Sequence, residues 1–587
     1  MRLNNIKKIF SILDKNLLLQ LGLLSIFTLL ISFLELVGIS FLASFILFLS
    51  DIDKFLLNLP KTDLINSITK LDNSSKIMLF LILITIVFSI KNLLIFIFTV
   101  FFNKTRVKIN LYISKAVLLK YLTSNYVFFL SKKMSQIIND IREETSRFTG
   151  IIFSYINVLK EALLILFLLI GIIAINWKVT LGVSLILFVI SYLIILLLKK
   201  KLIKLGQEQT YYSTRLYKNL YETFSGLKFI KVRFLEEYFF KKVAKTHESV
   251  FDVSFKQSIF VVIPRLMLEL IAVIGLCLTI YFFLEINYSF NEIIPMITFL
   301  SLAIIRMVPA ISALNNNINN ILSHSIAIDI VTNLIDTKTN NKNLKQENLN
   351  RNFEINTLEI KNVSFKYHTN VENVLNNINI KLKKNDILGI IGKSGCGKTT
   401  LVDIILGLLK PNNGKILINE KNIEEHNNLN LSYVPQSINV LDDNLNSNIA
   451  YGVSEEKINK EEVKKLINLM ELSNSQNNLN NNVGESGLNI SGGQKQRIGL
   501  ARGVYNNPSL IVLDEPTSEL DYETEEKIMQ SLVNQSNSKI LIIVAHRINT
   551  LNICNKLLIL DKGKLLDFGA KDEILDRHKY LEKYFQK

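Results

Sequence analysis

The chain has 587 residues, which is roughly four average domains and too long for a single small module. Its hydrophobic share of 49% is ordinary, but the mean hydropathy is +0.29 and the apolar residues are concentrated in the first half of the chain. The cysteines, Cys277, Cys396 and Cys554, are too few and too widely spaced for a disulfide framework or a cysteine zinc site. Composition therefore predicts a membrane half followed by a soluble half.

The net charge of +16 is carried mainly by Lys and Arg in residues 104–147 and 199–256. Each of these stretches lies between apolar runs, as expected from the positive-inside bias of membrane proteins. Nucleic-acid binding would instead need the positive charge to be gathered on one soluble surface. We therefore expect a membrane partner and no nucleic acid.

Six apolar stretches are long enough to cross a bilayer core, which takes about 20 helical residues. The positive-inside rule places the basic loops and both termini in the cytoplasm. Residues 53–70 mix apolar and polar side chains and predict a short amphipathic helix on the outer face. The six predicted spans lie near 17–49, 77–102, 150–174, 179–199, 259–284 and 291–313.

After the last span the pattern changes. Residues 336–352 are polar and lack apolar periodicity, as in a linker, and short β-branched runs then alternate with helical patterns. We predict an all-α transmembrane domain over 1–325, a linker over 326–352 and an α/β P-loop domain over 353–587.

A complete phosphate-binding loop follows an apolar strand pattern and precedes a helical one. Its glycines let backbone N–H groups surround phosphates, Lys398 reaches the β- and γ-phosphates, and the Thr399 hydroxyl ligates Mg²⁺. The sequence thus predicts ATP and Mg²⁺ as ligands of this loop. The predicted nucleotide-binding residues here are Gly392, Lys393, Ser394, Gly395, Cys396, Gly397, Lys398, Thr399 and Thr400.

A second motif is an apolar run, 510–513, that ends in two carboxylates. Asp514 suits the shell of a Mg²⁺ ion, and Glu515 is placed to polarise the attacking water. The alternative is an acidic pair at a strand end with no catalytic role, which the presence of the phosphate loop makes the weaker interpretation.

Between these motifs, residues 490–497 read Ile-Ser-Gly-Gly-Gln-Lys-Gln-Arg. Here the chain resembles the ATP-binding-cassette (ABC) family, whose signature usually begins with Leu where this chain has Ile490. Ser491 and the glycines open a helix, which makes a second anion site. The resemblance implies that Ser491, Gly492, Gly493 and Gln494 bind the ATP of a partner cassette.

Four further positions follow the order of the ABC family. The resemblance implies adenine stacking for Tyr367, Mg²⁺ sensing for Gln436, a partner-crossing loop at Asp521 and a γ-phosphate switch at His546. Glu519 stands where Ala is commoner. Six spans followed by one cassette resemble an exporter half-transporter, so two chains are needed; a homodimer is the economical expectation and a heterodimer the alternative.

Charged residues inside the predicted spans are costly and usually functional. One interpretation is that Lys91, Arg265 and Arg306 face a cavity and bind an anion, for which phosphate or pyrophosphate suits Arg best. The other is that charges neutralise each other, as Arg265 and Glu269 do at i,i+4 spacing. Lys160 and Glu161 are adjacent and are not expected to pair; Glu35 also lies within a span.

Residues 263–269 and 305–309, together with Lys91, resemble PglK-type flippases of bacterial protein glycosylation, which tend to carry Arg at the Lys91 position. This resemblance implies ATP-driven movement of a polyprenyl-pyrophosphate-linked oligosaccharide to the outer leaflet of a bacterial inner membrane. The alternatives are an exporter of another lipid, a drug or a peptide, and a non-transporting ATPase. Intact Glu515, Ser491 and His546 argue against the last.

Overall fold

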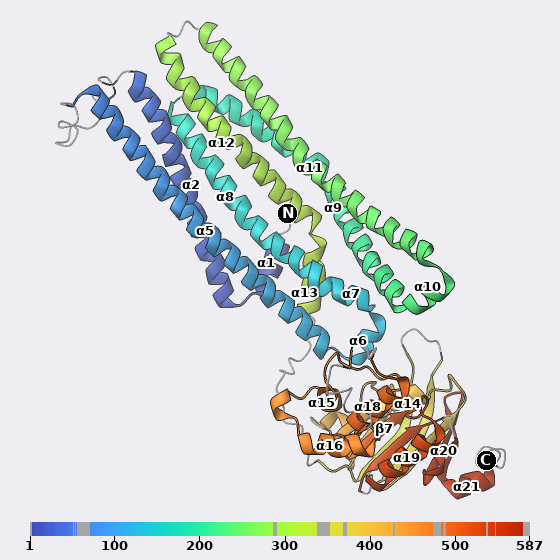
Figure 1. The fold of residues 1–587 in the computed structure, drawn as a ribbon. Coiled ribbons are helices and arrows are strands. Elements are labelled where there is room, and N and C mark those ends of the chain that lie inside the picture. The colour runs from blue at the N-terminus through green and yellow to red at the C-terminus, as the bar shows by residue number, and fades with distance from the viewer. Residues whose placement is uncertain are drawn as a thin grey trace. The chain divides into compact units, whose positions relative to one another are not determined.

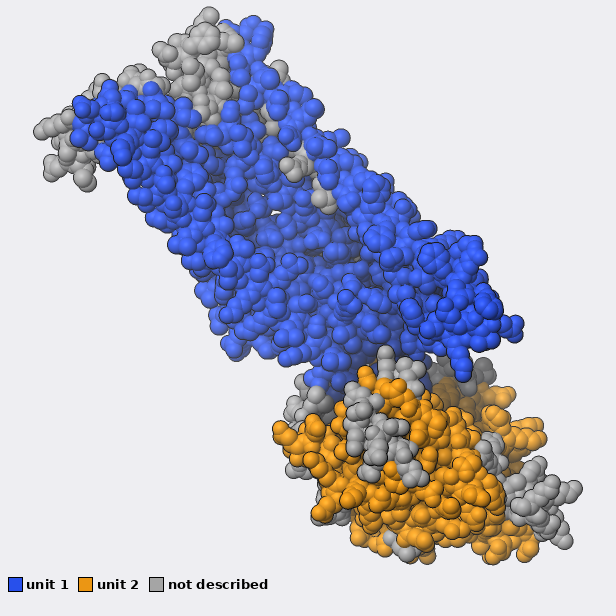
Figure 2. All heavy atoms as spheres, viewed as in Figure 1, with its two compact units in different colours: residues 1–124, 129–340 blue, residues 125–128, 341–587 orange. Residues whose placement is uncertain are grey.

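The computed structural model divides the chain into two units, residues 1–124 with 129–340 and residues 125–128 with 341–587 (Figure 2). Each unit is described by itself. The structure describes residues 3–50, 52, 55, 71–175, 177–285, 290–336, 353–367, 372–426, 429–473, 483–484, 489–535, 538–545 and 548–578. The predicted outer-face helix at 53–70 falls almost wholly outside them.

Long helices build the first unit, and six of them run over the predicted spans (Figure 1). Shorter helices, and one π-helical turn, precede or connect them. The long helices are α2 (Lys15–Ser50), α5 (Asn73–Thr123), α8 (Thr145–Ile175), α9 (Trp177–Ser225), α11 (Glu236–Glu285) and α12 (Phe290–Ser323). The shorter elements are α1 (Leu3–Ile12), α6 (Tyr126–Ser131), α7 (Met134–Asn139), the π-helix η1 (Asp140–Glu144), α10 (Leu227–Arg233) and α13 (Ile326–Asp336).

Within the described residues, three helical stretches are long and apolar enough to cross a membrane: Lys15–Ile46, Asn73–Thr123 and Met134–Gly171. In the most apolar window of Asn73–Thr123 no side chain is buried inside the unit. Farther along α5, buried residues recur every fourth position, from Thr105 to Tyr121, and form the stripe that faces its neighbours. The exposed apolar half of α5 therefore needs an apolar environment, which a bilayer supplies.

Helices α9 and α12 approach closely at Gly206. A Cβ atom at this position would lie 1.7 Å from the backbone oxygen of Ser323, which is far inside van der Waals contact. Because the obstacle is backbone rather than a flexible side chain, only glycine fits at this crossing.

Helix α13 corrects the predicted linker, because the segment 326–352 was expected to be irregular and its first part, Ile326–Asp336, is helical. The reason is its apolar spacing: Ala327, Ile328, Val331 and Leu334 are all buried in the core of the first unit. Residues 337–352 lie outside the described part of the chain.

The second unit is an α/β domain around a ten-stranded sheet with the strand order β5-β4-β1-β2-β10-β9-β3-β8-β7-β6. One part is antiparallel, and β3, β8, β7 and β6 form a parallel part with helices between its strands. The strands are β1 (Thr357–Phe365), β2 (Leu375–Lys383), β3 (Ile387–Gly392), β4 (Asn413–Ile418), β5 (Lys421–Asn422), β6 (Leu431–Val434), β7 (Leu510–Asp514), β8 (Ile540–Val544), β9 (Lys556–Asp561) and β10 (Lys564–Ala570).

Two apolar cores cover the two faces of this sheet, and strands such as β7 and β8 are buried along their whole length. That burial explains their continuous Ile, Leu and Val runs. The fold class predicted from the sequence, a helical membrane domain followed by an α/β nucleotide-binding domain, is confirmed.

The helices of the second unit are α14 (Lys398–Ile405), α15 (Leu445–Ile449), α16 (Lys460–Leu469), α18 (Gly492–Val504), α19 (Tyr522–Gln535), α20 (Ile548–Asn552) and α21 (Lys571–Arg577), with 3₁₀ turns η2 (Ile423–Glu425) and η3 (Glu455–Lys457).

Candidate nucleotide site and membrane charges

The predicted nucleotide-binding segments meet at one edge of the parallel sheet. Val544 at the end of β8 is opposite Asp514 of β7 on one side, and Ile390 of β3 pairs with it on the other. Val434, the last residue of β6, is opposite Leu513. Since parallel strands end at the same edge, the loops that follow β3, β6, β7 and β8 lie together, as in other ligand-binding α/β domains.

The phosphate loop joins β3 to α14 in a conformation that requires glycine. Gly395 and Gly397 have φ angles of +78° and +107°, which side chains rarely adopt. The Lys398 ammonium donates to the carbonyl oxygens of Gly392, at 2.7 Å, and Lys393, at 3.1 Å. Thr399 is exposed in the first turn of α14. The loop thus carries an N-terminal helix end, a lysine and an exposed hydroxyl, which suit a nucleotide phosphate.

Tyr367, the predicted adenine platform, is half-buried after β1. Its hydroxyl lies 3.3 Å from that of Thr400 on α14, and its ring contacts Phe365 edge-on with centroids 4.9 Å apart. The structure thus places Tyr367 beside the phosphate-loop helix.

Asp514 and Glu515 follow one another at the end of β7. Glu515 is held with φ +49°, and its N–H donates to Val544 of β8 at 2.9 Å. The Gln436 amide donates to Glu515 Oε2 at 2.8 Å, and the Tyr433 hydroxyl to Asp514 Oδ2 at 3.5 Å. The strained Glu515 backbone is therefore fixed by the neighbouring strand, and its carboxylate by the loop after β6.

Negative charge collects near Asp514. Burial, followed by the charge of Asp514, raises the pKa of Asp403 on α14 to about 6. Burial and the same carboxylate also raise the pKa of the Tyr433 hydroxyl. A divalent cation at this edge would relieve the repulsion. Among the described residues, no group of three or more His, Cys, Asp and Glu could hold a metal ion. Asp514, Thr399 and Gln436 offer oxygen donors, the type that Mg²⁺ takes together with phosphate oxygens.

Helix α18 begins at the signature motif with a reciprocal cap. The Ser491 hydroxyl accepts from the Gln494 N–H at 3.2 Å, and the Gln494 side chain accepts from the Ser491 N–H at 2.8 Å. A Cβ atom on Gly492 would lie 1.5 Å from a carboxylate oxygen of Glu519, so the unusual Glu519 lies directly against the signature. Gly493 is beside the Glu519 backbone.

Gln496, within the signature, connects helix α18 to the segment that follows β7, a link that sequence reasoning missed. Its buried amide donates to the Glu515 carbonyl and to the Ser518 hydroxyl, each at 3.0 Å, and it accepts from the Glu519 N–H at 2.7 Å. Asp521 begins α19 and accepts from the Thr524 N–H at 3.1 Å; this bond holds the pKa of Asp521 below its usual value.

His546 lies outside the described residues, so its predicted role as a switch stays a prediction. The helix that follows it, α20, is tied to α19 and to the segment after β7 through Glu525, which is 2% exposed. Glu525 accepts from Thr517 at 2.9 Å and from Thr550 of α20 at 2.6 Å. Sequence reasoning missed this cluster because Thr517 and Thr550 are far apart in the chain and neither stands out as a motif.

In the membrane domain, the structure brings together Lys91 of α5 and Arg306 of α12, but around a carboxylate. Arg306 Nη2 contacts Glu35 Oε1, and Lys91 Nζ lies 3.5 Å from Glu35 Oε2. The expected pairing within α11 remains untested, because the side chain of Arg265 lies outside the described residues. The expectation for Lys160 and Glu161 was wrong: their charged groups pair at 3.2 Å, since both side chains are flexible enough to bend together.

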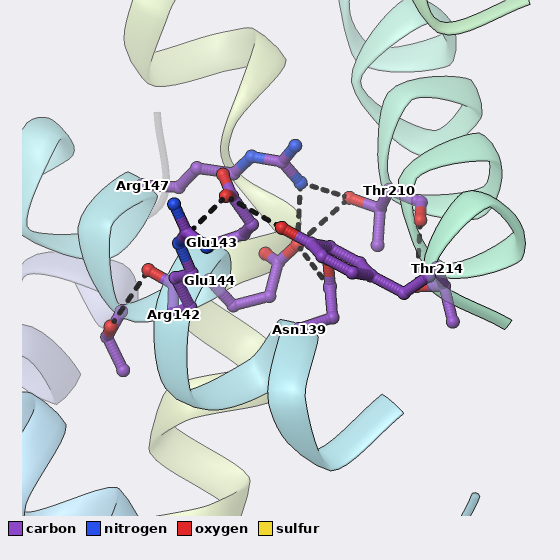
Figure 3. Close-up of polar contacts among 9 residues, drawn as sticks. Asn139, Arg142, Glu143, Glu144, Arg147, Thr210 and Thr214 are labelled. Carbon is purple, nitrogen blue, oxygen red and sulfur yellow. Dashed lines mark hydrogen bonds and ion pairs between the residues drawn. The ribbon is translucent and has the colours of Figure 1, made fainter. Parts of the chain in front are cut away.

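A further polar cluster joins the π-helical turn before α8 to helix α9 (Figure 3). Arg147 donates to Glu144 at 2.6 Å and to Thr210 at 2.9 Å, and Thr210 donates to Glu144 at 3.3 Å. Asn139 also donates to Glu144, at 3.4 Å. Because Glu144 is fully buried, these contacts hold α8 and α9 together at this level.

Both halves of the chain match known protein families. Residues 18–307 match the profile described as "ABC transporter transmembrane region", and residues 375–518 match the one described as "ABC transporter". The chain is similar to a bacterial Atm1-family ABC exporter whose structure was solved with ATP bound, with a TM-score of 0.77, 19% identity and coverage of 97% of this chain and 98% of that one. At that identity the likeness speaks for the fold alone.

Sequence relatives agree on the general class. An export ATP-binding/permease protein of Rickettsia typhi is 36% identical over 223 residues, which are 36% of this chain and only 38% of that protein. An ATP-dependent lipid A-core flippase of Cupriavidus pinatubonensis is 26% identical over 463 residues, 76% of this chain and 77% of the relative.

Proposed function

Because this chain has the transmembrane and nucleotide-binding domains of an ABC exporter, we propose that it is an ATP-driven lipid flippase. Its cargo is a polyprenyl-pyrophosphate-linked oligosaccharide, which it moves from the cytoplasmic to the outer leaflet of a bacterial inner membrane. The observation that carries the cargo assignment is the meeting of Lys91 and Arg306 around Glu35, between α2, α5 and α12, since two neighbouring cations suit a pyrophosphate.

The nucleotide-binding domain hydrolyses ATP and couples hydrolysis to transport. Lys398 binds the phosphates, and Glu515, oriented by Gln436, polarises the attacking water. Thr399, Asp514 and Gln436 would hold Mg²⁺, which would neutralise the charge of the phosphates. His546 follows β8 in the sequence and acts on the γ-phosphate.

Two copies of the chain form the transporter. Each chain supplies one phosphate loop and one signature, and the exposed apolar half of α5 offers surface for lipid or a second chain. We place both termini and the nucleotide-binding domains in the cytoplasm, because the basic loops then lie on the inner side.

The test is ATP-dependent movement of a radiolabelled pyrophosphate-linked oligosaccharide in proteoliposomes, beside a Glu515→Gln control. Arg306→Met should reduce lipid transfer more than basal ATP hydrolysis, because it removes a cargo contact and no nucleotide contact. Lys160→Met is the matched control, an intramembrane lysine already paired with Glu161. Equal loss of transfer and hydrolysis in Arg306→Met would mean that Arg306 only stabilises the bundle.

A second candidate is an exporter of a different phosphorylated lipid. The flippase relative named for lipid A-core, which aligns over both domains, favours this alternative over a drug or peptide exporter. Adding lipid A-core as a competing cargo in the same proteoliposomes separates the two candidates, since only the preferred lipid is moved at limiting ATP.

A further inference from the structure

The two membrane cations that we assign to cargo binding share a single carboxylate. Glu35 of α2 is 7% exposed and directs one oxygen to Arg306 and the other to Lys91. The three residues come from three helices at similar depth. Each lies 15 to 18 residues from the helix end assigned to the outer face (Ser50, Asn73 or Phe290), which corresponds to about 22–27 Å along a helix.

The ion pairs of Glu35 lie next to apolar side chains. An apolar cluster of α2, α8 and α12 packs next to it and includes Ile39, Leu164, Leu168 and Met307. The Lys91 stem passes 3.6 Å from where a Cβ of Gly38 would be, on the same face of α2, and its ammonium lies 4.4 Å from the Phe88 ring centroid. The Lys91 and Glu35 side chains are 11% and 7% exposed, so their ion pair is stronger than in water and an unpaired charge there is costly, whereas Arg306 is 43% exposed.

We propose that Glu35 is a specificity-determining residue: it occupies Lys91 and Arg306 so that a single phosphate does not displace it and a pyrophosphate does. This inference rests on the proposed function. With the carboxylate in place, the two cations leave one net positive charge in the described cluster. A bilayer contains many lipids with one phosphate, and a site with two uncompensated cations would retain them.

A pyrophosphate has two linked phosphates, each with ionised oxygens, and therefore replaces both ion pairs that Glu35 makes. The Nε–H group of Arg306 can donate a further hydrogen bond, because Nε is buried and has no hydrogen-bond partner among the described residues. An incoming phosphate oxygen satisfies that donor, which Glu35 leaves unmet. A single phosphate replaces only one pair and leaves Glu35 on the other cation.

The first experiment measures anion binding without transport. In a Lys398→Ala background, which weakens the phosphate loop, the thermal stabilisation of detergent-solubilised protein is recorded with inorganic pyrophosphate or inorganic phosphate. The parent should prefer pyrophosphate. Glu35→Gln should bind both, so that the preference falls about tenfold, and Glu35→Asp should keep it. Glu161→Gln is the matched control, because it removes another paired intramembrane carboxylate.

Glu35→Gln leaves two cations unpaired and risks misfolding, so a second variant accompanies it. Glu35→Gln/Lys91→Gln leaves one cation and no carboxylate, and should bind both anions without preference. A parental preference for pyrophosphate in either folded variant overturns the proposal. A lower melting temperature with an unchanged preference does so as well, because it assigns Glu35 a purely structural role.

The second experiment compares transport of the pyrophosphate-linked oligosaccharide with that of fluorescent phosphatidylglycerol in proteoliposomes. The wild type should move the former, and Glu35→Gln should also move the latter. If the wild type moves neither while the anion preference depends on Glu35, the proposed function fails and the selectivity inference stands. If the wild type moves the oligosaccharide and Glu35→Gln has the same selectivity, the inference fails alone.

Discussion

The candidate nucleotide site and the membrane helices hold their charged side chains in different ways. At the candidate nucleotide site, Lys398, Glu515 and Asp521 make hydrogen bonds to backbone groups and to the Gln436 amide. In the membrane domain, charges are oriented by one another: Glu35 takes two cations, and Glu161 takes Lys160.

The difference follows from the solvent of each region. Water screens a charged loop, so a nucleotide site tolerates unpaired charge until its ligand binds. A helix bundle in lipid does not, and a cation there needs a partner or a bound anion. Membrane charges are therefore informative only together with their counterions, whereas loop motifs are informative alone.

The largest effect is expected for the carboxylate that we assign to catalysis, Glu515. Glu515→Gln should lower ATP hydrolysis by about 10²- to 10⁴-fold, because it removes the general base and keeps the hydrogen bond to Gln436. Phosphate release measures the rate, and nucleotide binding checks that the site survives. Hydrolysis within a factor of two of wild type would show that this loop carboxylate is not catalytic.

The second-largest effect is expected on stability, at the backbone contact between α9 and α12, which involves no charged group. Gly206→Ala should destabilise the membrane domain by about 1–3 kcal/mol, because the new Cβ meets the Ser323 backbone. Thermal unfolding in detergent would show the loss as a lower Tm. Gly150→Ala on α8, where a Cβ meets nothing within 4 Å, is the control and should hold or raise Tm. Equal Tm values for both variants would contradict the close crossing.

The buried carboxylate of Glu525, in the second unit, tests whether a residue that contacts no ligand positions the nucleotide site. Glu525→Gln should lower the kcat of ATP hydrolysis about tenfold and leave KM for ATP unchanged, because the bonds to Thr517 and Thr550 weaken. The exposed Glu523→Gln is the control. A change in KM alone would place Glu525 in nucleotide binding instead.

The smallest effect concerns pH. Asp403 has a folded-state pKa raised to about 6 against an ordinary 3.8, so the folded state binds more protons than the unfolded state between these values. Stability should therefore fall as pH rises from about 4 to 6 and change little from this group above pH 7. Asp403→Asn should flatten that part of the Tm profile measured without Mg²⁺. An identical slope in both proteins would refute the assignment.

The sequence was most informative where one motif has a local geometry. The glycines of the phosphate loop, the Asp514–Glu515 pair and the Ser491 cap were all predictable, because strand, turn and helix are read from adjacent residues. Gln496, Glu525 and Glu35 were not assigned their contacts, since each depends on partners from distant segments. Ile326–Asp336 was expected as linker because it adjoins the polar stretch 336–352, although seven of its eleven residues are apolar.

The partners of the membrane charges were also out of reach of the sequence. The sequence identified Lys91 and Arg306 as unusual, yet the i,i+4 rule directs attention to partners within one helix. Their common partner is on α2, which only the packing of three helices brings near. Arg265 and His546 remain predictions from the sequence alone.

The crossing at Gly206 has a mechanical meaning. Because the backbones of α9 and α12 lie against each other at this level, a rigid-body tilt of α9 would turn about the Gly206 contact. Helix α9 extends from Gly206 to Ser225 on one side and back to Trp177 on the other, arms of about 30 and 45 Å. A rotation of a few degrees there would displace both ends of α9 by a few ångströms in opposite directions.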